Sequence, residues 1–301
     1  MSTLTGKLRY LGGCVLKVLR GQGRACPSCG GLVSEVLDRK AWVLAFRRCA
    51  GCQLLFRAPT TSAAENEAFY QTAYQQGFTT DLPSEQELQL LLESRFEGHD
   101  KNYAGYIAVL RALGVPQGAR EFDFGCSWGY GSWQLAQAGF AVEAFEISRP
   151  RAEFAHTRLG VQMRQPEALP EGGYDVFFSA HVIEHVPSVA AMLELGLRLL
   201  KPGGLFVCFT PNGSLSFRRR NSQAWHLMWG EAHPQLIDEV LLTLRWPSLP
   251  LLLTSAPLHQ PERPHPLAEI AAWNRRAQPV VSTLDEVELM SAVDKYLPSP
   301  L

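Results

Sequence analysis

Four cysteines near the beginning of the sequence have the spacing of a metal site. Cys26-Pro27-Ser28-Cys29 and Cys49-Ala50-Gly51-Cys52 are C-x-x-C pairs separated by nineteen residues, which is typical of zinc sites. A tight turn brings the two sulfurs of each pair together, and Gly30 and Gly51 supply the backbone freedom for these turns. Four thiolates leave a metal no open coordination position. We therefore expect a structural Zn²⁺ held by Cys26, Cys29, Cys49 and Cys52; the alternatives are four unligated cysteines or a redox pair.

A glycine-rich turn and a downstream acid have the pattern of half a nucleoside site. The turn Gly125-Cys126-Ser127-Trp128-Gly129 follows an expected strand at 120–124, and Glu146 ends the next expected strand at 141–145. Glycines let a ligand approach the backbone, and an acid at the end of the next strand can accept both ribose hydroxyls. Ser127 and Tyr130 replace two glycines of the dinucleotide motif G-x-G-x-x-G, which disfavours a dinucleotide. The Cβ of Ser127 is expected to fit if that residue keeps a negative φ.

A second pair of expected strands, joined by an expected helix, follows along the chain. The segment Tyr174 to Ala180 has the pattern of a buried strand, and His181-Val182-Ile183-Glu184-His185 comes directly after it. An apolar helical pattern then ends at Lys201-Pro202-Gly203-Gly204, and Leu205 to Thr210 reads as the next strand.

These motifs together resemble those of class I S-adenosylmethionine-dependent methyltransferases. They cover residues 120 to 212 in the order and at the spacings of that family. The resemblance implies that Glu146 binds the ribose hydroxyls, that Glu167 borders the adenine, and that Ala180 and His181 lie near the reactive sulfonium. It assigns the methionine end of the cofactor to the first expected strand and its turn, namely Asp123, Gly125, Cys126, Ser127, Trp128 and Gly129.

Methyl transfer by in-line displacement needs alignment above all, and a base helps when the acceptor is a hydroxyl or an acidic C–H. Histidine is the usual base near neutral pH. His181 would end a strand at the cofactor, and His226 and His233 lie in or next to the variable segment after Asn212, where this family often builds its acceptor pocket. His181, His226 and His233 are therefore the candidate bases, and His185 is expected to be part of the scaffold.

The group His181, Glu184 and His185 has a second interpretation as a metal site. It is similar to the E-x-x-E-H element of metal-assisted O-methyltransferases, which include small-RNA 3′-end and quinone-pathway enzymes, with His181 in place of the first acid. Mg²⁺ prefers oxygen ligands, so this replacement argues against magnesium.

The acceptor is left open by the sequence. A zinc ribbon, a Tyr70-x₃-Tyr74 pair and a class I domain also resemble sugar C-methyltransferases that act on nucleotide-linked sugars, and Arg218-Arg219-Arg220 could bind a phosphate or be a solvated charge run. Residues 26 to 60 carry five basic and two acidic side chains, and four thiolates around Zn²⁺ remove about two of the three net positive charges. This favours a small-molecule acceptor over nucleic acid, and a sugar or nucleotide-linked sugar is the candidate that the second resemblance suggests. The alternatives are an RNA-end 2′-O-methyltransferase and a non-catalytic interaction protein that retains the fold.

Composition sets the remaining limits. The chain has 301 residues, a net charge of -1 and seven cysteines, of which four lie in C-x-x-C pairs. This argues against a disulfide framework and predicts a reducing compartment, the cytoplasm. No apolar run reaches the roughly 20 residues of a membrane span. Residues 1–25 carry five cations and no acid, and we expect an amphipathic arm packed on the protein rather than membrane contact.

The predicted architecture is an α/β protein with a Rossmann-like, seven-stranded, mostly parallel sheet and helices on both faces. The expected segments are a basic arm at 1–25, a zinc ribbon at 26–60, a helical lid at 61–116 and the catalytic domain at 117–301. In the lid, Ser84 to Glu87 resembles a helix capping box. The last strands are expected at Leu251 to Thr254 and Val280 to Val281.

Overall fold

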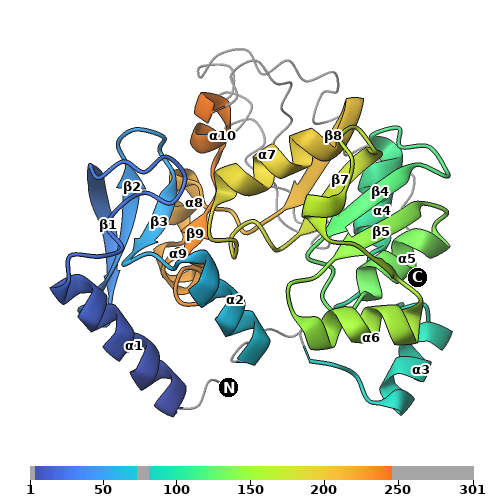
Figure 1. Ribbon diagram of the computed structural model, residues 1–301, viewed down its shortest axis with the longest axis horizontal. Helices are drawn as coiled ribbons and strands as arrows, with labels where there is room; N and C mark the ends of the chain where they lie inside the picture. The colour runs from blue at the N-terminus through green and yellow to red at the C-terminus, as the bar shows by residue number, and fades with distance from the viewer. Residues whose placement is uncertain (1–3, 73–80, 246–301) are drawn as a thin grey trace. The chain divides into compact units, whose positions relative to one another are not determined.

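The computed structural model describes residues 4–72 and 81–245, and these residues form two compact units (Figure 1). Of the described residues, unit 1 contains 4–72, 179–198 and 208–245, whereas unit 2 contains 81–178 and 199–207. The sequence did not predict that segments beyond residue 178 would group with the cysteine-rich part. The four predicted segments therefore remain a hypothesis about the chain's organisation.

Unit 1 is built on a small antiparallel sheet in the order β1-β2-β3-β9. Its strands are β1 (Ser34–Lys40), β2 (Leu44–Cys49), β3 (Leu55–Ala58) and β9 (Gln235–Leu236), so the last strand comes from far along the chain. The helices whose residues fall wholly or mostly in this unit are α1 (Leu4–Leu19), α2 (Ala63–Thr72), α7 (Val189–Leu199), α8 (Leu215–Arg220), α9 (Ser222–Met228) and α10 (Glu239–Arg245).

An aromatic cluster forms the core of unit 1. Phe46 on β2 stacks on Trp229 at 4.9 Å and meets Trp225 edge to face at 5.2 Å. Cys14 of α1 is buried in the same cluster, with Tyr10 and Leu11 packed against it. Burial of this many aromatic rings is the main stabilising contribution available to so small a sheet. The amino-terminal arm therefore packs on the protein through one of its faces, as expected.

Unit 2 contains most of the second sheet, whose strand order is β6-β5-β4-β7-β8. Strands β4 and β5, β4 and β7, and β5 and β6 pair in parallel. The strands are β4 (Arg120–Phe124), β5 (Ala141–Phe145), β6 (Gln162–Met163), β7 (Tyr174–Ala180) and β8 (Leu200–Phe209). The helices are α3 (Glu85–Glu93), α4 (Ala104–Ala112), α5 (Tyr130–Gln137), α6 (Arg149–Leu159) and the short η1 (Pro166–Ala168).

The sheet has a topological switch point between β4 and β7: the chain adds β5 and β6 on one side of β4, and then β7 and β8 on the other. In open α/β sheets such a switch point is where ligands bind, outside the carboxyl ends of the strands. One face of the sheet is aromatic, because Phe177 contacts Phe122, Phe124 and Phe206 at ring distances of 4.8–5.9 Å. The other face of β4 carries Asp123, whose carboxylate meets α5. The α/β, Rossmann-like fold with a parallel sheet is thus confirmed.

Two local predictions differ from the structure, and others fall on residues that the structure does not describe. The described residues hold five strands of this sheet rather than seven, and the segments expected as last strands, 251–254 and 280–281, lie outside those residues, as does Tyr74. The segment Lys201 to Gly204 was expected to separate the helix from the next strand, but it is part of strand β8. Helix α7 therefore leads directly into the strand. The capping box at Ser84 and Glu87 is present. Among residues 4–72 and 81–245, no helix is long and apolar enough to cross a bilayer.

Candidate functional site

The glycine turn after β4 is tied to the end of β5. The backbone N–H groups of Gly125 and Cys126 both donate to the carbonyl of Phe145, at 2.8 and 3.0 Å. Gly125 and Gly129 have φ values of +88° and +87°, which only glycine adopts without strain. A Cβ at Gly129 would also lie 2.7 Å from the Cβ of Ala155. These glycines hold the turn close against α6 and leave its backbone open to a ligand.

Ser127 does not have the negative φ on which its acceptance was predicted to depend. Its φ is +53°, in the left-handed region that disfavours residues with a Cβ. This conformation aims its backbone N–H at Glu146, whose Oε2 accepts the hydrogen bond at 2.9 Å. Strained residues of this kind cluster at functional sites, where surrounding structure holds them in place. Ser127 therefore links the glycine turn to the acid that follows β5.

Backbone N–H groups bond to both carboxylate oxygens of Glu146, and that of Ile147 adds to them. Besides the bond from Ser127, Oε1 accepts the backbone N–H of Ser148 at 2.8 Å. Burial raises the pKa of Glu146, and the amide of Ser148 opposes that rise. A carboxylate offers about four acceptor positions in total, which is more than these backbone bonds occupy. The carboxylate is thus fixed in orientation and can still accept the two hydroxyls of a ribose.

Asp123 is a buried acid on β4, with 1% of its surface exposed. Its Oδ2 accepts a hydrogen bond from Ser132 Oγ at 2.5 Å. Burial raises the pKa of Asp123 to about 7, with Ser132 opposing and the nearby Glu146 adding to the effect. Within unit 2 this is a carboxylate that a cationic group would stabilise in its charged form. An amino acid ammonium has the required charge.

The other residues predicted to bind the cofactor differ in their exposure and in the unit to which they belong. The side chains of Cys126 and Trp128 are buried, and the Trp128 ring packs against Tyr130 and Phe154, so these residues can face a ligand only through their backbone. Glu167 is exposed on η1, immediately after β6. Ala180 is the last residue of β7 and belongs to unit 1.

Unit 1 contains a compact cluster of one acid and two histidines. Ligand atoms of Glu184, His185 and His233 all lie within 4.8 Å of one another. Nδ1 of His185 donates to the carbonyl of Ala232 at 2.7 Å, and Nδ1 of His233 donates to that of Met228 at 2.7 Å. Carbonyl partners fix the proton on Nδ1, so the lone pair of each ring is on Nε2.

The acid of this cluster is fully buried. Oε2 of Glu184 accepts a hydrogen bond from Thr210 Oγ1 at 3.0 Å, and Oε1 has no hydrogen-bond partner. Burial tends to raise the pKa of Glu184, but His181 and His185 outweigh it and the pKa is lowered. Burial lowers the pKa of His185 to about 4, so that ring is neutral at pH 7. The donor set is two imidazoles and one carboxylate, which suits borderline transition metals better than Mg²⁺.

The sequence predicted His233 as a candidate base and did not place it with Glu184 and His185. It lies 48 residues after His185, and only the fold brings the two rings to a centroid distance of 4.5 Å. His181, the predicted third member, lies at the edge: its Nδ1 is 3.7 Å from Glu184 Oε1 and its side chain is 56% exposed. Tyr70 meets the His185 ring edge to face at 6.2 Å.

His181 occupies a special backbone position. It follows the last residue of β7 with a φ of +58°, and its N–H donates to the carbonyl of Phe209 at 2.8 Å. The left-handed conformation turns the side chain out of the strand's alternation. An exposed imidazole at the end of a strand is accessible to the proton of an acceptor.

His226 is held by the small sheet. Its Nδ1 lies 2.6 Å from Asp38 Oδ2 on β1, and Trp229 Nε1 donates to the same oxygen at 2.9 Å. These two bonds outweigh burial and lower the pKa of Asp38. The neighbouring Arg218 donates to the carbonyl of Leu37 and its guanidinium lies over the Trp225 ring at 4.9 Å. Arg218 is therefore occupied in holding α8 on the sheet, whereas Arg219 and Arg220 are exposed.

The four cysteines converge as their spacing predicts. Cys26 Sγ lies 3.5 Å from Cys52 Sγ, and Cys29 Sγ lies 3.4 Å from Cys49 Sγ. All four sulfurs lie within 4.8 Å of one another. Sulfurs at the corners of a tetrahedron with Zn–S bonds of about 2.3 Å are about 3.8 Å apart. The geometry therefore fits a four-coordinate ion.

The turns around these cysteines differ in one detail from the prediction. Gly30 has a φ of +72°, but the matching residue of the second pair is Gln53, at +64°, and not Gly51. Burial would raise the pKa of Cys49, but the backbone amides of Cys52 and Gly51, together with the Cys29 and Cys26 thiols, lower it to about 7. Amide donors of this kind favour a thiolate at Cys49.

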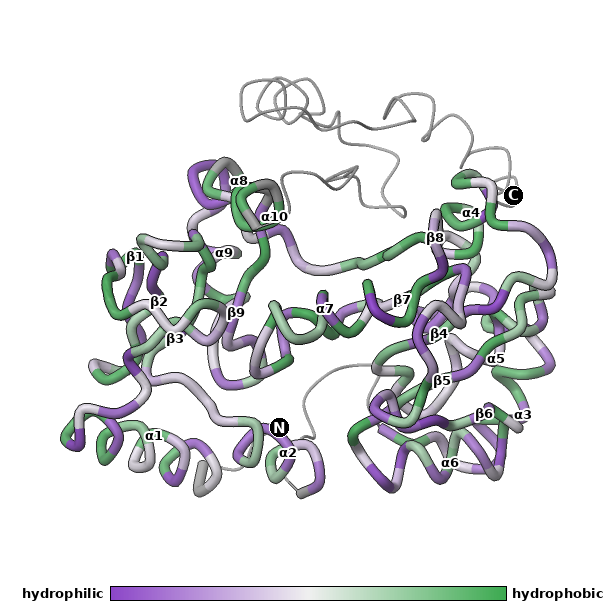
Figure 2. Tube along the Cα trace, turned by 45° about the horizontal axis from the view of Figure 1, so that its top comes forward, coloured by the Kyte–Doolittle hydropathy of each residue, from purple (hydrophilic) through white to green (hydrophobic). Residues whose placement is uncertain are grey.

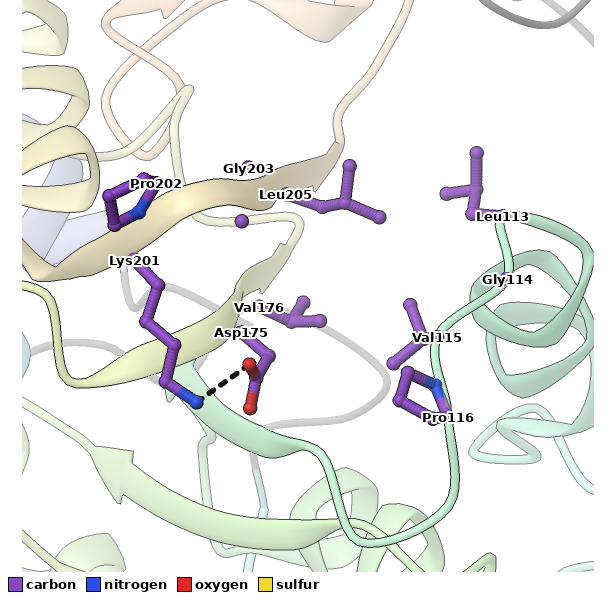
Figure 3. Close-up of a pocket in the computed structure, with 11 residues that line it drawn as sticks. Leu113, Gly114, Val115, Pro116, Asp175, Val176, Lys201, Pro202, Gly203 and Leu205 are labelled. Atoms are coloured by element: carbon purple, nitrogen blue, oxygen red, sulfur yellow. Dashed lines mark hydrogen bonds and ion pairs between the residues drawn. The ribbon is translucent and has the colours of Figure 1, made fainter.

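A separate cavity of about 260 Å³ lies in unit 2 (Figure 3). The Lys201–Asp175 ion pair, at 2.7 Å, lies within its lining. Asp175 is at the amino end of β7, whereas the glycine turn follows the carboxyl end of the parallel strand β4. This cavity is therefore at the opposite edge of the sheet from the turn.

Comparison with known proteins gives matches of one kind. A family model described as a methyltransferase domain matches residues 99–246. The chain is 34% identical over 136 residues to a ubiquinone biosynthesis O-methyltransferase of Paramagnetospirillum magneticum, which covers 42% of this chain and 52% of that protein. It is 36% identical over 104 residues to a protein of the same name from Ruegeria pomeroyi, covering 32% and 42%. The chain thus spans about half the length of the curated relatives it matches.

Solved structures with similar folds include two S-adenosylmethionine-dependent methyltransferases. One, from Mesorhizobium loti, has a TM-score of 0.31 and 24% identity and covers 35% of this chain and 52% of that one. Another, from Aquifex aeolicus, has a TM-score of 0.31 and 21% identity, with coverage of 42% and 72%.

Proposed function

Residues 99–246 belong to the class I S-adenosylmethionine-dependent methyltransferases, and on that premise we propose that this chain transfers a methyl group to an oxygen atom of a small-molecule acceptor. The observation that carries the proposal is the arrangement of Asp123, Ser127 and Glu146 around the glycine turn. The names of the relatives support O-methylation and give no particular support to a sugar acceptor.

The residues of unit 2 fit the cofactor. Glu146 would hold the ribose hydroxyls, the turn at Gly125 would allow the close approach of the ligand, and Asp123 would hold the ammonium of the methionine end. S-adenosylmethionine, when bound, supplies a methyl group on a positively charged sulfur. The protein's main task is then alignment, which can lower the barrier by roughly 7 to 11 kcal/mol. Glu167 is kept as a proposed neighbour of the adenine.

His181 is the proposed general base. It directly follows β7, which pairs with β4, the strand that ends at the glycine turn. Its exposed imidazole would take the proton of the acceptor hydroxyl, and the buried carboxylate of Glu184 would stabilise the resulting imidazolium. His226 is the second candidate, because its bond to Asp38 leaves Nε2 available. His233 is less suited, since its ring belongs to the Glu184 cluster.

A second role for that cluster has its own observation. His185 and His233 each donate their Nδ1–H to a backbone carbonyl, and Oε1 of Glu184 has no hydrogen-bond partner. The two imidazoles and this carboxylate oxygen form the donor set of a three-ligand metal site. A cation held there would lower the pKa of an acceptor hydroxyl and replace the histidine base. We propose Zn²⁺ as a structural ion at Cys26, Cys29, Cys49 and Cys52, independent of this cluster.

The experiment that tests the function is transfer of a labelled methyl group to a panel of acceptors. The panel contains catechols and hydroxylated aromatics, nucleotide-linked sugars, and short RNAs with free 3′ ends. We expect label in a hydroxylated small molecule. Label only in RNA would support the RNA-end alternative, and binding of cofactor without transfer to any acceptor would support a non-catalytic interaction protein.

A further inference from the structure

Helix α1 carries apolar side chains on two different sides. Cys14 is buried in the aromatic core of unit 1, with Tyr10 and Leu11 beside it. Leu8, Val15 and Leu19 are instead 62%, 44% and 78% exposed. At 100° per residue, these three positions fall within about 40° of one another and about 120° from Cys14. Figure 2 shows apolar and polar residues alternating along this helix.

We define Leu8, Val15 and Leu19 as the exposed stripe. Gly12 lies between its members along the helix, with no atom within 4 Å of a Cβ built there, and the neighbouring Leu16 is 53% exposed. None of the three stripe residues belongs to the aromatic cluster of Phe46, Trp225 and Trp229 that α1 packs against. Exposed leucines arranged in one line are uncommon on a soluble protein and mark an interaction surface.

The charged side chains of the arm itself are all basic. Residues 1–25 contain Lys7, Arg9, Lys17, Arg20 and Arg24 and no acid. Lys17 is occupied, because its Nζ contacts Glu65 and the carbonyl of Thr60. Viewed down the axis of α1, Arg9 and Arg20 lie about 80 to 120° around the helix from the stripe, and Lys7 lies on the opposite side of the stripe. Burial is the main cause of the lowered pKa of Arg47, and the positive charges of Arg39 and Arg24 lower it further. Cations therefore outnumber acids here: Glu65 pairs with Lys17, and Lys7 opposes the rise that burial causes in the pKa of Glu231.

One face of α1 packs on the protein, and we propose that the other face, contrary to the expectation from the sequence, binds the surface of an anionic membrane. The helix would lie in the plane of the interface, with the exposed stripe among the acyl chains and with Arg9 and Arg20 on lipid phosphates. Its sixteen residues span about 24 Å, less than the roughly 30 Å of a bilayer core, so it lies on the membrane and does not cross it. The proposal does not depend on the proposed methyl transfer and is tested without cofactor.

Two other occupants fit the observations less well. Nucleic acid would use the arginines, but phosphates and sugars gain little from a line of leucine side chains. A second copy of the chain would bring a second set of the same cations against the first, which is unfavourable for a symmetric contact. An anionic lipid surface is the partner that satisfies both the stripe and the charges.

The test is sedimentation of the full chain with lipid vesicles. Vesicles of equal phosphatidylcholine and phosphatidylglycerol are compared with vesicles of phosphatidylcholine alone, at low and at high salt. We expect at least tenfold tighter binding to the anionic vesicles, weakened by salt. The double variant L8E/L19E and, separately, R9A/R20A are each expected to lose at least tenfold. Leu90→Glu on α3 is the matched control, because Leu90 is also exposed, at 65%, and binding is expected to be unchanged.

Circular dichroism and the melting temperature show that each variant is folded. The proposal is overturned if L8E/L19E binds anionic vesicles as the parent chain does, or if the chain shows no preference for anionic lipid. It is also overturned if the same variants abolish binding of a single-stranded RNA while vesicle binding persists, or if light scattering shows a dimer that L8E/L19E dissociates and no vesicle binding.

Discussion

Replacement of Asp123 by asparagine should stabilise the protein in a way that depends on pH. The carboxyl is buried beside Ser132, and burial raises its pKa from 3.8 to about 7. A group whose pKa is higher in the folded state binds more protons when folded, so its contribution to stability falls as the pH rises through the interval between the two values. Asparagine has nearly the same shape and no proton to lose.

The size of the effect follows from the shift. A difference of about three units at 1.36 kcal/mol per unit gives about 4 kcal/mol at pH 8, and almost none of this effect is present at pH 4. The altered hydrogen bond to Ser132 adds a constant offset at all pH values. We therefore expect the difference in unfolding free energy, Asp123→Asn minus parent, to rise by about 4 kcal/mol between pH 4 and pH 8.

The assay is urea unfolding of both proteins at half-unit steps between pH 4 and pH 8, followed by circular dichroism. Taking the difference between the two proteins at each pH removes the titration of all other groups that the substitution leaves unchanged. Glu171→Gln is the control, because Glu171 is exposed in the loop before β7 and its difference should not change with pH. A flat difference for Asp123→Asn, or one that falls as the pH rises, would refute the reasoning.

Three further predictions concern the same sites. Ser127→Gly should raise the unfolding free energy by about 0.5 to 1 kcal/mol in the same urea assay, because glycine relieves the strain at φ +53°; an unchanged or lower value contradicts this. Cys49→Ser should remove close to one zinc per chain and lower the melting temperature, as measured by metal analysis and calorimetry; well under one zinc in the parent chain would end the zinc proposal. His233→Gln should abolish metal-dependent activation if Glu184, His185 and His233 hold a metal, whereas activity that survives chelation while the cysteine-bound zinc stays in place leaves His181 as the base.

The parallel sheet and its site were readable from local signals. The turn at Gly125, the acid Glu146 and the cysteine pairs each act over a few residues, and the backbone geometry they require is encoded in their types. The structure places each where its spacing predicted. The glycine reasoning failed only where another residue adopts a positive φ, as Ser127 and Gln53 do.

The remaining features depend on contacts between distant segments. Nothing in the sequence around His233 indicates that it meets His185, and nothing near His226 indicates its bond to Asp38. Strand β9 pairs with β3 across about 180 residues, and a two-residue strand leaves no periodic signal. The histidines were therefore found by residue type, and their partners could be assigned only from the structure.

Calorimetric titration with S-adenosylmethionine and S-adenosylhomocysteine tests the central claim most directly. We expect the parent chain to bind both at one site, Glu146→Ala to bind at least tenfold more weakly because it loses the acceptor for the ribose hydroxyls, and Glu171→Ala to bind as the parent does. Failure of the parent chain to bind either compound, or equal binding by Glu146→Ala, would contradict the account.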